Sequence, residues 1–278
     1  MRDGDEFIDE EGAVVNDEGE TMTGGDETTR QATKKRASTG SALGFRSVVR
    51  VHGTGPTAVR ALGPIDLDVA DGEFVAVMGP SGSGKSTFLG LAGALDLPTE
   101  GRVTILGTDL AQLGTSQSAT LRRRAIGFVF QELNLLPGLT ALENVALPLE
   151  LDGVSSNEAR RQSVEALARV QMERLSHRFP DDLSGGEQQR VAIARAMVGE
   201  RRLLLADEPT GALDSVTGEV VMRCLREHVD RGRTVVLVTH DSSHAAWADR
   251  VVFLRDGQIL RETRSSRPFL PRVLGPRP

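Results

Sequence analysis

A glycine-rich segment followed by a lysine and two hydroxyl side chains is the part of this sequence with the most specific chemistry. It has the pattern G-x-x-x-x-G-K-[ST], and its residues are Gly79, Pro80, Ser81, Gly82, Ser83, Gly84, Lys85, Ser86 and Thr87. The glycines allow backbone N–H groups to surround an anion without Cβ clashes. The lysine can reach the β- and γ-phosphates of a nucleotide, and the Ser86 hydroxyl can bind Mg²⁺. We therefore predict a nucleotide site with Mg²⁺.

The segments on either side of this loop are the ones that a phosphate-binding loop requires. Residues 74–78 form a short apolar run typical of a buried strand. Four apolar residues after the loop have the spacing of one helix face, namely Phe88, Leu91, Ala92 and Leu95. The loop would thus lead from a strand into a helix N-terminus, where unpaired N–H groups and the helix dipole favour an anion.

Polar side chains follow three further apolar runs. Asp207 and Glu208 come directly after residues 203–206, a run typical of a strand buried in a parallel sheet. Ligands of open α/β sheets bind at the carboxyl ends of the strands, so Asp207 can hold Mg²⁺ and Glu208 can deprotonate an attacking water. His240, after residues 235–238, could contact a γ-phosphate or hold that water. Gln131, after Phe128–Phe130, is a similar polar group at a strand end.

A second helix N-terminus lies further along the chain, at Ser184, Gly185, Gly186 and Glu187. Ser184 and Glu187 have the S-x-x-E spacing of a capping box, which predicts that a helix begins here. Adjacent glycines at a helix N-terminus make a second anion-binding end. Because one phosphate group needs only one such end, this one would serve a nucleotide held by another copy. An ordinary capped helix is the alternative interpretation.

Composition limits the class of protein. The chain has 278 residues, and residues 1–28 contain 11 acidic side chains and one basic side chain. The remaining residues have a net charge of +4, which gives little support to a nucleic-acid-binding protein. No apolar run approaches the ~18 residues of a membrane span, and the N-terminus lacks the apolar core of a signal peptide, so we expect a cytoplasmic location. Cys224, the single cysteine, lies in a helical pattern and should be a packed structural thiol.

The order of predicted elements indicates an α/β fold between two tails. Residues 1–42 are acidic and aperiodic and should be disordered, and residues 264–278 form an Arg- and Pro-rich tail. Between them, residues 43–263 contain predicted antiparallel strands, with Ile65, Leu67 and Val69 at alternate positions. Predicted helices cover residues 142–151 and 157–172, and a closing hairpin covers residues 251–260.

These motifs, in this order, resemble the ATPase domain of ABC transporters. The resemblance covers about residues 45–262, and the segments Gly127–Gln131, Asn134–Pro137 and Glu143–Pro148 resemble the subgroup for lipoprotein release, macrolide export and cell division. It implies a P-loop NTPase fold with a RecA-like core built on a parallel sheet, an antiparallel β subdomain and a helical subdomain at about 132–183. It also implies hydrolysis of ATP to ADP and phosphate with Mg²⁺.

The resemblance further implies that two copies pair head to tail around two ATP molecules. Lys85, Ser86, Asp207 and Glu208 of one copy would face Ser184, Gly185 and Gly186 of the other. Gln131 would link the Mg²⁺ site to the helical subdomain, and Asp214 would lie at the dimer seam. His52 occupies the position where the family usually has an aromatic residue that stacks on adenine, and we hypothesise weaker base selectivity.

The function that the resemblance implies is that of an ATP-hydrolysing subunit on the cytoplasmic face of the membrane. Its partner would be a separate permease, of a four-span type with a large external domain, and nucleic acid is not expected. Two alternatives remain open. In one, ATP cycling regulates an external enzyme without transport; in the other, a soluble ABC ATPase acts on DNA or ribosomes. The sequence does not define the cargo.

Overall fold

The computed structural model describes residues 7–8, 14–15, 40–211 and 213–264. Residues 1–37 and 38–278 are two separate units. In the first, β1 (Phe7–Ile8) pairs antiparallel with β2 (Val14–Val15), and both short strands fall inside the segment predicted to be disordered. Apart from these two strands, residues 1–39 lie outside the described residues, and so do residues 265–278 of the C-terminal tail. In the second unit strand pairing extends slightly beyond the predicted range of residues 43–263, since Ser41 pairs with Ala70 and Arg264 with Arg250.

An antiparallel sheet forms one side of the second unit. Its strand order is β4 (Val59–Ala70), β3 (Ser41–His52), β6 (Glu100–Ile105) and β7 (Thr108–Asp109). Side chains of β4 alternate between buried and exposed from Ile65 to Ala70, as expected for a strand with one face against the core. The predicted antiparallel flank is therefore present, and it is longer than the apolar pattern indicated.

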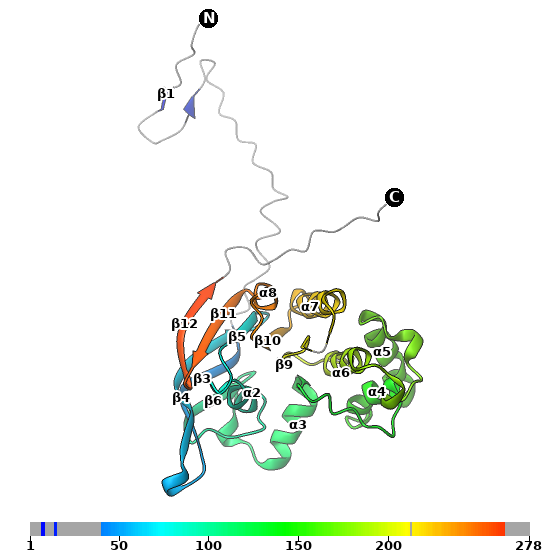
Figure 1. Ribbon diagram of the computed structural model, residues 1–278, viewed down its shortest axis with the longest axis horizontal. Helices are drawn as coiled ribbons and strands as arrows, with labels where there is room; N and C mark the ends of the chain where they lie inside the picture. The colour runs from blue at the N-terminus through cyan, green and yellow to red at the C-terminus, as the bar shows by residue number, and fades with distance from the viewer. Residues whose placement is uncertain (1–6, 9–13, 16–39, 212, 265–278) are drawn as a thin grey trace, which may run out of the picture. The chain divides into compact units, whose positions relative to one another are not determined.

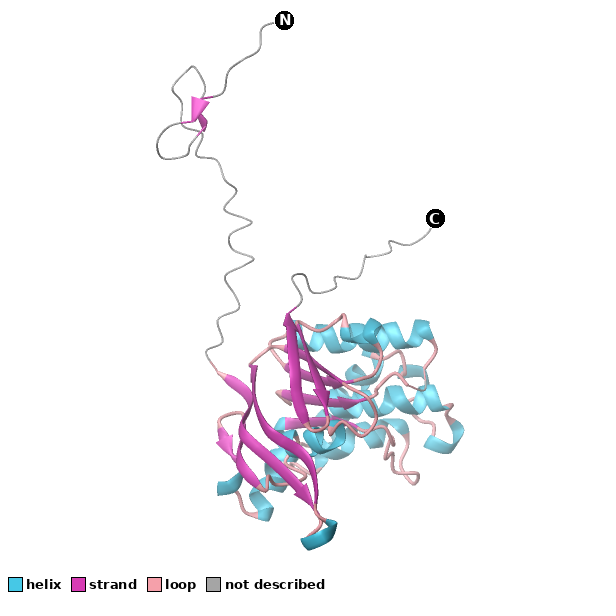
Figure 2. Ribbon diagram, turned by 60° about the vertical axis from the view of Figure 1, so that its left-hand side comes forward, coloured by secondary structure: helices cyan, strands magenta, loops and turns pink. Residues whose placement is uncertain are grey.

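A six-stranded sheet carries the polar strand ends. Its order is β12 (Gln258–Arg264), β11 (Arg250–Arg255), β5 (Phe74–Met78), β10 (Thr234–Val238), β9 (Leu203–Asp207) and β8 (Ile126–Val129). All neighbouring strands are parallel except β11 and β12, which form the predicted hairpin. Every residue of β10 is buried, because helices and the second sheet cover both faces of such a strand. The two sheets lie side by side in Figure 2.

Helices complete the fold, and most of them lie on the side of the parallel sheet away from the β3–β4 pair (Figures 1 and 2). The α-helices are α2 (Lys85–Ala92), α3 (Thr115–Ala125), α4 (Ala141–Glu150), α5 (Ser156–Arg169), α6 (Gly185–Met197), α7 (Ser215–Asp230) and α8 (Ser242–Ala245). Short 3-10 helices cover Gly55–Thr57, Leu110–Gln112, Glu173–Leu175 and Pro180–Asp182. Helices α4, α5 and α6 contact one another, and they bury their apolar faces in one cluster with β9 and α7.

Two predictions about helices were incomplete. Helix α2 ends at Ala92, so Leu95 does not belong to its buried face and is 52% exposed. Helix α5 ends at Arg169, although the pattern predicted helix to residue 172.

Cys224 lies buried in α7, where its Sγ donates to the Arg169 carbonyl oxygen, so the predicted structural thiol is confirmed. Among the described residues, no helix is long and apolar enough to cross a membrane.

Candidate active site

The phosphate loop, residues 79–84, connects β5 to α2. Gly84 has a φ of 101°, and a Cβ on it would lie 2.6 Å from the Ala61 carbonyl oxygen. A Cβ on Gly79 would collide with the Leu254 carbonyl oxygen. Both glycines are therefore required by packing within the subunit. No side chain caps the N-terminus of α2, so its first N–H groups remain available to an anion.

Lys85, the first residue of α2, points its ammonium group back across the loop. Its Nζ donates to the carbonyl oxygens of Gly79 at 2.8 Å and Pro80 at 2.9 Å. Its positive charge opposes the net rise in the pKa of Asp207, which burial mainly causes, and the net rise in the pKa of His240, which Glu208 mainly causes. The ammonium group thus lies between the loop and the polar ends of the neighbouring strands.

Asp207 and Glu208 lie where β9 ends. Burial raises the pKa of Asp207, the nearby Glu208 charge raises it further, and Lys85 opposes both effects. Glu208 has a positive φ of 47° and its N–H donates to the Val238 carbonyl oxygen of β10 at 3.0 Å. A left-handed conformation is costly for a residue with a side chain. Here the neighbouring strand fixes it and directs the Glu208 carboxylate toward the end of β10.

The Glu208 carboxylate is held by His240, two residues beyond the end of β10. Glu208 Oε1 lies 2.7 Å from His240 Nδ1 and accepts the His240 backbone N–H at 3.1 Å. The hydrogen bond to the carboxylate raises the pKa of His240, and the Glu208 charge adds to this effect. The Glu208 side chain is 18% exposed and that of His240 is 76% exposed. This geometry fixes a carboxylate that can accept a proton and leaves the imidazole open to a ligand.

These groups line one pocket with a volume of about 1080 Å³. It contains Gly79, Pro80, Ser81, Gly82, Gly84, Lys85, Ser86, Thr87, Gln131, Asp207, Glu208 and His240, which the sequence had singled out. Ser83 is buried behind the loop and is not part of the pocket wall. His52, at the end of β3, lies beside the loop, with its Nε2 3.5 Å from Thr87 Oγ1. The fold thus brings four distant segments to one site.

The N-terminus of α6 does not belong to the lining of this pocket in the described part of the chain. The predicted capping box is present: Glu187 Oε2 accepts the Ser184 backbone N–H at 2.8 Å, and Ser184 Oγ accepts the Glu187 N–H at 3.4 Å. These bonds to Ser184 lower the pKa of Glu187. Ser184 and Gly185 are exposed. The predicted second anion-binding end is therefore solvent-exposed and outside the lining of this pocket.

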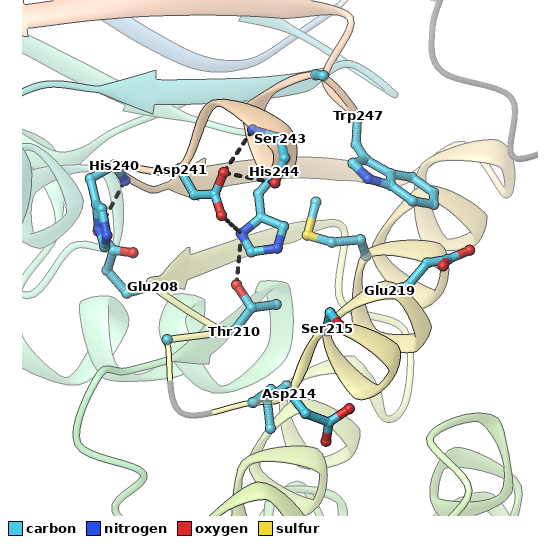
Figure 3. A pocket seen from close by; sticks show the side chains of 15 residues that line it. Glu208, Thr210, Asp214, Ser215, Glu219, His240, Asp241, Ser243, His244 and Trp247 are labelled. Carbon is cyan, nitrogen blue, oxygen red and sulfur yellow. Dashed lines mark hydrogen bonds and ion pairs between the residues drawn. The ribbon is translucent and has the colours of Figure 1, made fainter.

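A second pocket, of about 910 Å³, shares Glu208, Gly211 and His240 with the first. Figure 3 shows it with Asp214 at one end and Trp247 at the other. Asp214 lines this pocket and caps α7, accepting the N–H groups of Val216 and Thr217, each at 3.0 Å. The carboxylate that the resemblance assigns to a dimer seam is thus fixed by its own helix, and it lines the same pocket as Glu208 and His240.

Some residues of the two pockets were missed by the sequence analysis. Gln189 of α6 and Arg60 of β4 line the first pocket. In the second, Thr210 Oγ1 lies 3.0 Å from His244 Nδ1, and His244 Nδ1 lies 3.5 Å from the Asp241 carboxylate. Thr210 follows Glu208 closely and His244 follows His240 closely in the sequence, but only the pairing of β9 with β10 shows that they meet.

Comparison with known proteins identifies the family of this chain. Residues 62–211 match the family model described as ABC transporter. The chain is 46% identical over 225 residues to the uncharacterized ABC transporter ATP-binding protein MJ0796 of Methanocaldococcus jannaschii, covering 79% of this chain and 96% of that protein. It is 49% identical over 220 residues to the macrolide export ATP-binding/permease protein MacB of Brucella melitensis, covering 79% of this chain. It spans 34% of that relative's length.

Solved structures of MJ0796 are similar as well. The dimeric post-hydrolysis state bound to ADP and Pi has a TM-score of 0.76 at 44% identity, and covers 80% of this chain and 98% of that one. A second dimeric structure of MJ0796 has the same TM-score at 45% identity. The chain therefore belongs to the ABC transporter family, in the subgroup that includes MacB. It has the ABC ATPase fold, binds ATP and hydrolyses it.

Proposed function

We propose that this chain is the ATP-hydrolysing subunit of a transport complex, and that two copies close around two ATP molecules to drive a separate permease. Gly185 is the observation that carries the proposal. A Cβ on Gly185 would meet no atom within 4 Å, and the residue lies in a helix with an ordinary φ. Nothing among the described residues of its own subunit requires a glycine there. A close approach by a second molecule would require one, and the related MJ0796 structures are dimeric.

The residues of the first pocket suit ATP with Mg²⁺. The loop amides and Lys85 would hold the phosphates, because both present donors to an anion. Ser86, Gln131 and Asp207 offer a hydroxyl, an amide oxygen and a carboxylate, which are the oxygen ligands that Mg²⁺ prefers. The described residues contain no cluster of three or more His, Cys, Asp or Glu for a metal.

Hydrolysis would depend mainly on positioning and electrostatics. Mg²⁺, when bound, would neutralise the charge that develops on the phosphates. Glu208 would accept the proton of the attacking water, since its carboxylate is fixed by His240 at 2.7 Å. The other face of the imidazole would contact the γ-phosphate, and Lys85 would stabilise the transition state. Ser184, Gly185, Gly186 and Glu187 of the second copy would complete the site, with Asp214 near the contact between copies.

The helical subdomain offers a surface for the permease. Four large apolar side chains between residues 132 and 183 are exposed: Leu136 at 45%, Leu151 at 62%, Val164 at 42% and Phe179 at 45%. Gln131, in the nucleotide pocket, leads directly into this subdomain. The related MacB is named as an ATP-binding/permease protein. Our proposal for this chain is a permease on a separate chain, with this subunit on the cytoplasmic side of the membrane. The four-span type with a large external domain belongs to this proposal.

The variant Glu208→Gln tests this function, because it keeps the shape of the side chain but cannot accept the proton. We expect it to bind MgATP, to lose hydrolysis by at least about 100-fold, and to form a dimer that retains ATP. Size-exclusion chromatography with light scattering would measure the dimer, with ADP as the control ligand that leaves a monomer. A monomer in saturating MgATP, or continued hydrolysis, would contradict the proposal.

A further inference from the structure

Gln189 is a buried polar residue in the nucleotide pocket to which no role has been given. It lies in the second turn of α6, is 3% exposed, and lines the pocket together with Gln131, Asp207 and Glu208. Among the described residues, no acceptor lies within hydrogen-bonding distance of its buried Nε2. A buried amide without a partner destabilises a fold, and natural proteins contain few of them. An apolar side chain of similar size would avoid that cost.

Gln189 lies on the helix that connects the Ser184–Gly185 end to the segment around Gln131. The helix begins with Ser184 and Gly185, and it packs against β8, the strand that leads to Gln131. Near the other end of α6, Arg195 donates to the carbonyl oxygens of Asn134 at 2.6 Å and Leu133 at 2.7 Å. Burial lowers the pKa of this guanidinium. A shift of α6 would therefore move both the glycine-rich end and the segment that follows Gln131.

We infer that Gln189 binds ATP: its side-chain amide donates to the terminal phosphate, or to a water which that phosphate holds, in the subunit's own pocket. The bond would pull α6 toward an occupied pocket and set Ser184–Gly186 for the nucleotide of the second copy. ADP has no such phosphate and would leave the Gln189 donor without a partner. This inference rests on the proposed dimer.

The test uses Gln189→Leu in the Glu208→Gln background and follows the dimer by sedimentation during a titration with MgATP. We expect the half-point of dimer formation to move to at least about tenfold higher ATP, because one charge-assisted hydrogen bond is lost. The affinity for ADP should stay within about twofold. The melting temperature without nucleotide should rise by about 1–3 °C, because an unpaired amide has been removed.

Two further variants make the result specific. Gln189→Met is a second apolar replacement with an unbranched side chain, which guards against poor packing of leucine. Gln162→Leu is the matched control, because Gln162 lies on α5, donates to Glu158 at 2.7 Å, and does not line the pocket. It should leave the ATP half-point unchanged.

The outcomes separate this inference from the proposed function. If Glu208→Gln alone stays monomeric in MgATP, both fail. If it dimerises and the added Gln189→Leu or Gln189→Met change leaves the ATP half-point unmoved, only the role of Gln189 is overturned. A fall in melting temperature with an equal loss of ADP and ATP affinity would also overturn it, because a purely structural amide behaves in that way.

Discussion

The two glycine-rich segments of this chain, residues 79–84 and 184–186, differ in how their own subunit constrains them. Gly84 has a positive φ and its Cβ position is blocked by the Ala61 carbonyl oxygen at 2.6 Å. Gly185 has open space where a Cβ would be, and the nearest atom to a Cβ on Gly186 is Leu213 Cδ2 at 3.2 Å. The first segment is thus explained by the fold of one copy. In the second, Gly186 is restricted by Leu213 of its own copy, whereas no described residue of that copy restricts Gly185. This difference supports our proposal that a second subunit approaches Gly185.

The largest expected effect comes from adding one methyl group to each segment. Gly84→Ala should destabilise the protein by at least about 2 kcal/mol, because it combines a left-handed backbone with a clash against a carbonyl oxygen. Gly185→Ala should change stability by less than about 0.5 kcal/mol, yet it should reduce dimer formation and ATPase activity at least about tenfold. Thermal unfolding and ATPase assays measure both. Equal loss of stability in the two variants would remove the distinction between the segments.

A smaller effect concerns pH titration, because each region contains one side chain with a shifted pKa, His240 near the first segment and Glu187 near the second. The Glu208 hydrogen bond raises the pKa of His240, whereas the capping box lowers the pKa of Glu187. The His240 pair therefore stabilises the fold below the unfolded pKa of about 6.5, and that stabilisation is lost as pH rises through the folded value. NMR titration of the isolated subunit should give His240 a pKa above 6.5.

The control for this titration is the variant Glu208→Gln, which removes the charge and should return the His240 pKa toward its ordinary value. Because both residues belong to one chain, the shift should not depend on protein concentration. An unshifted His240 in the unmodified protein would mean that the pair needs the second copy, and would weaken the contrast between the two regions.

The smallest effect is expected at His52, which lies beside the nucleotide pocket and next to Thr87 of α2. An imidazole there could stack on a purine, over less area than a larger ring. His52→Ala should weaken ATP and GTP binding by about two- to fivefold, and His52→Tyr should increase the preference for ATP over GTP. Titration calorimetry on the monomer measures both. Unchanged affinities in His52→Ala would show that His52 does not contact the base.

Much of this arrangement was predictable because the signals are local. The phosphate loop has a fixed spacing, and the runs before Asp207 and His240 end where buried strands end. Helix α3 was not predicted, since none of its residues is buried and a helix without an apolar face shows no periodicity. Leu95 was misplaced because α2 ends at Ala92, although Phe88, Leu91 and Ala92 form its buried face as predicted. The first failure reflects a missing apolar face, and the second reflects a helix end that the apolar spacing does not mark.

The remaining features depend on tertiary pairing. The contact between Thr210 and His244 arises because β9 and β10 are neighbours, although they are separated by α7 in the chain. Gln189 follows the capping box by two residues, but only the packing of α6 against β8 places its amide in the nucleotide pocket. The spacing of residues in the sequence identifies side chains that could do chemistry. The order of strands in the sheet determines which of these side chains share a pocket.

The central claim is that the phosphate loop of one copy and Ser184–Gly186 of another make one site. It is tested most directly by mixing two variants that are each inactive, Lys85→Ala and Gly185→Trp, and measuring ATPase activity. A mixed dimer contains one site with both halves intact, so random mixing should restore about a quarter of the unmodified activity. A mixture no more active than the two separate variants would contradict the claim.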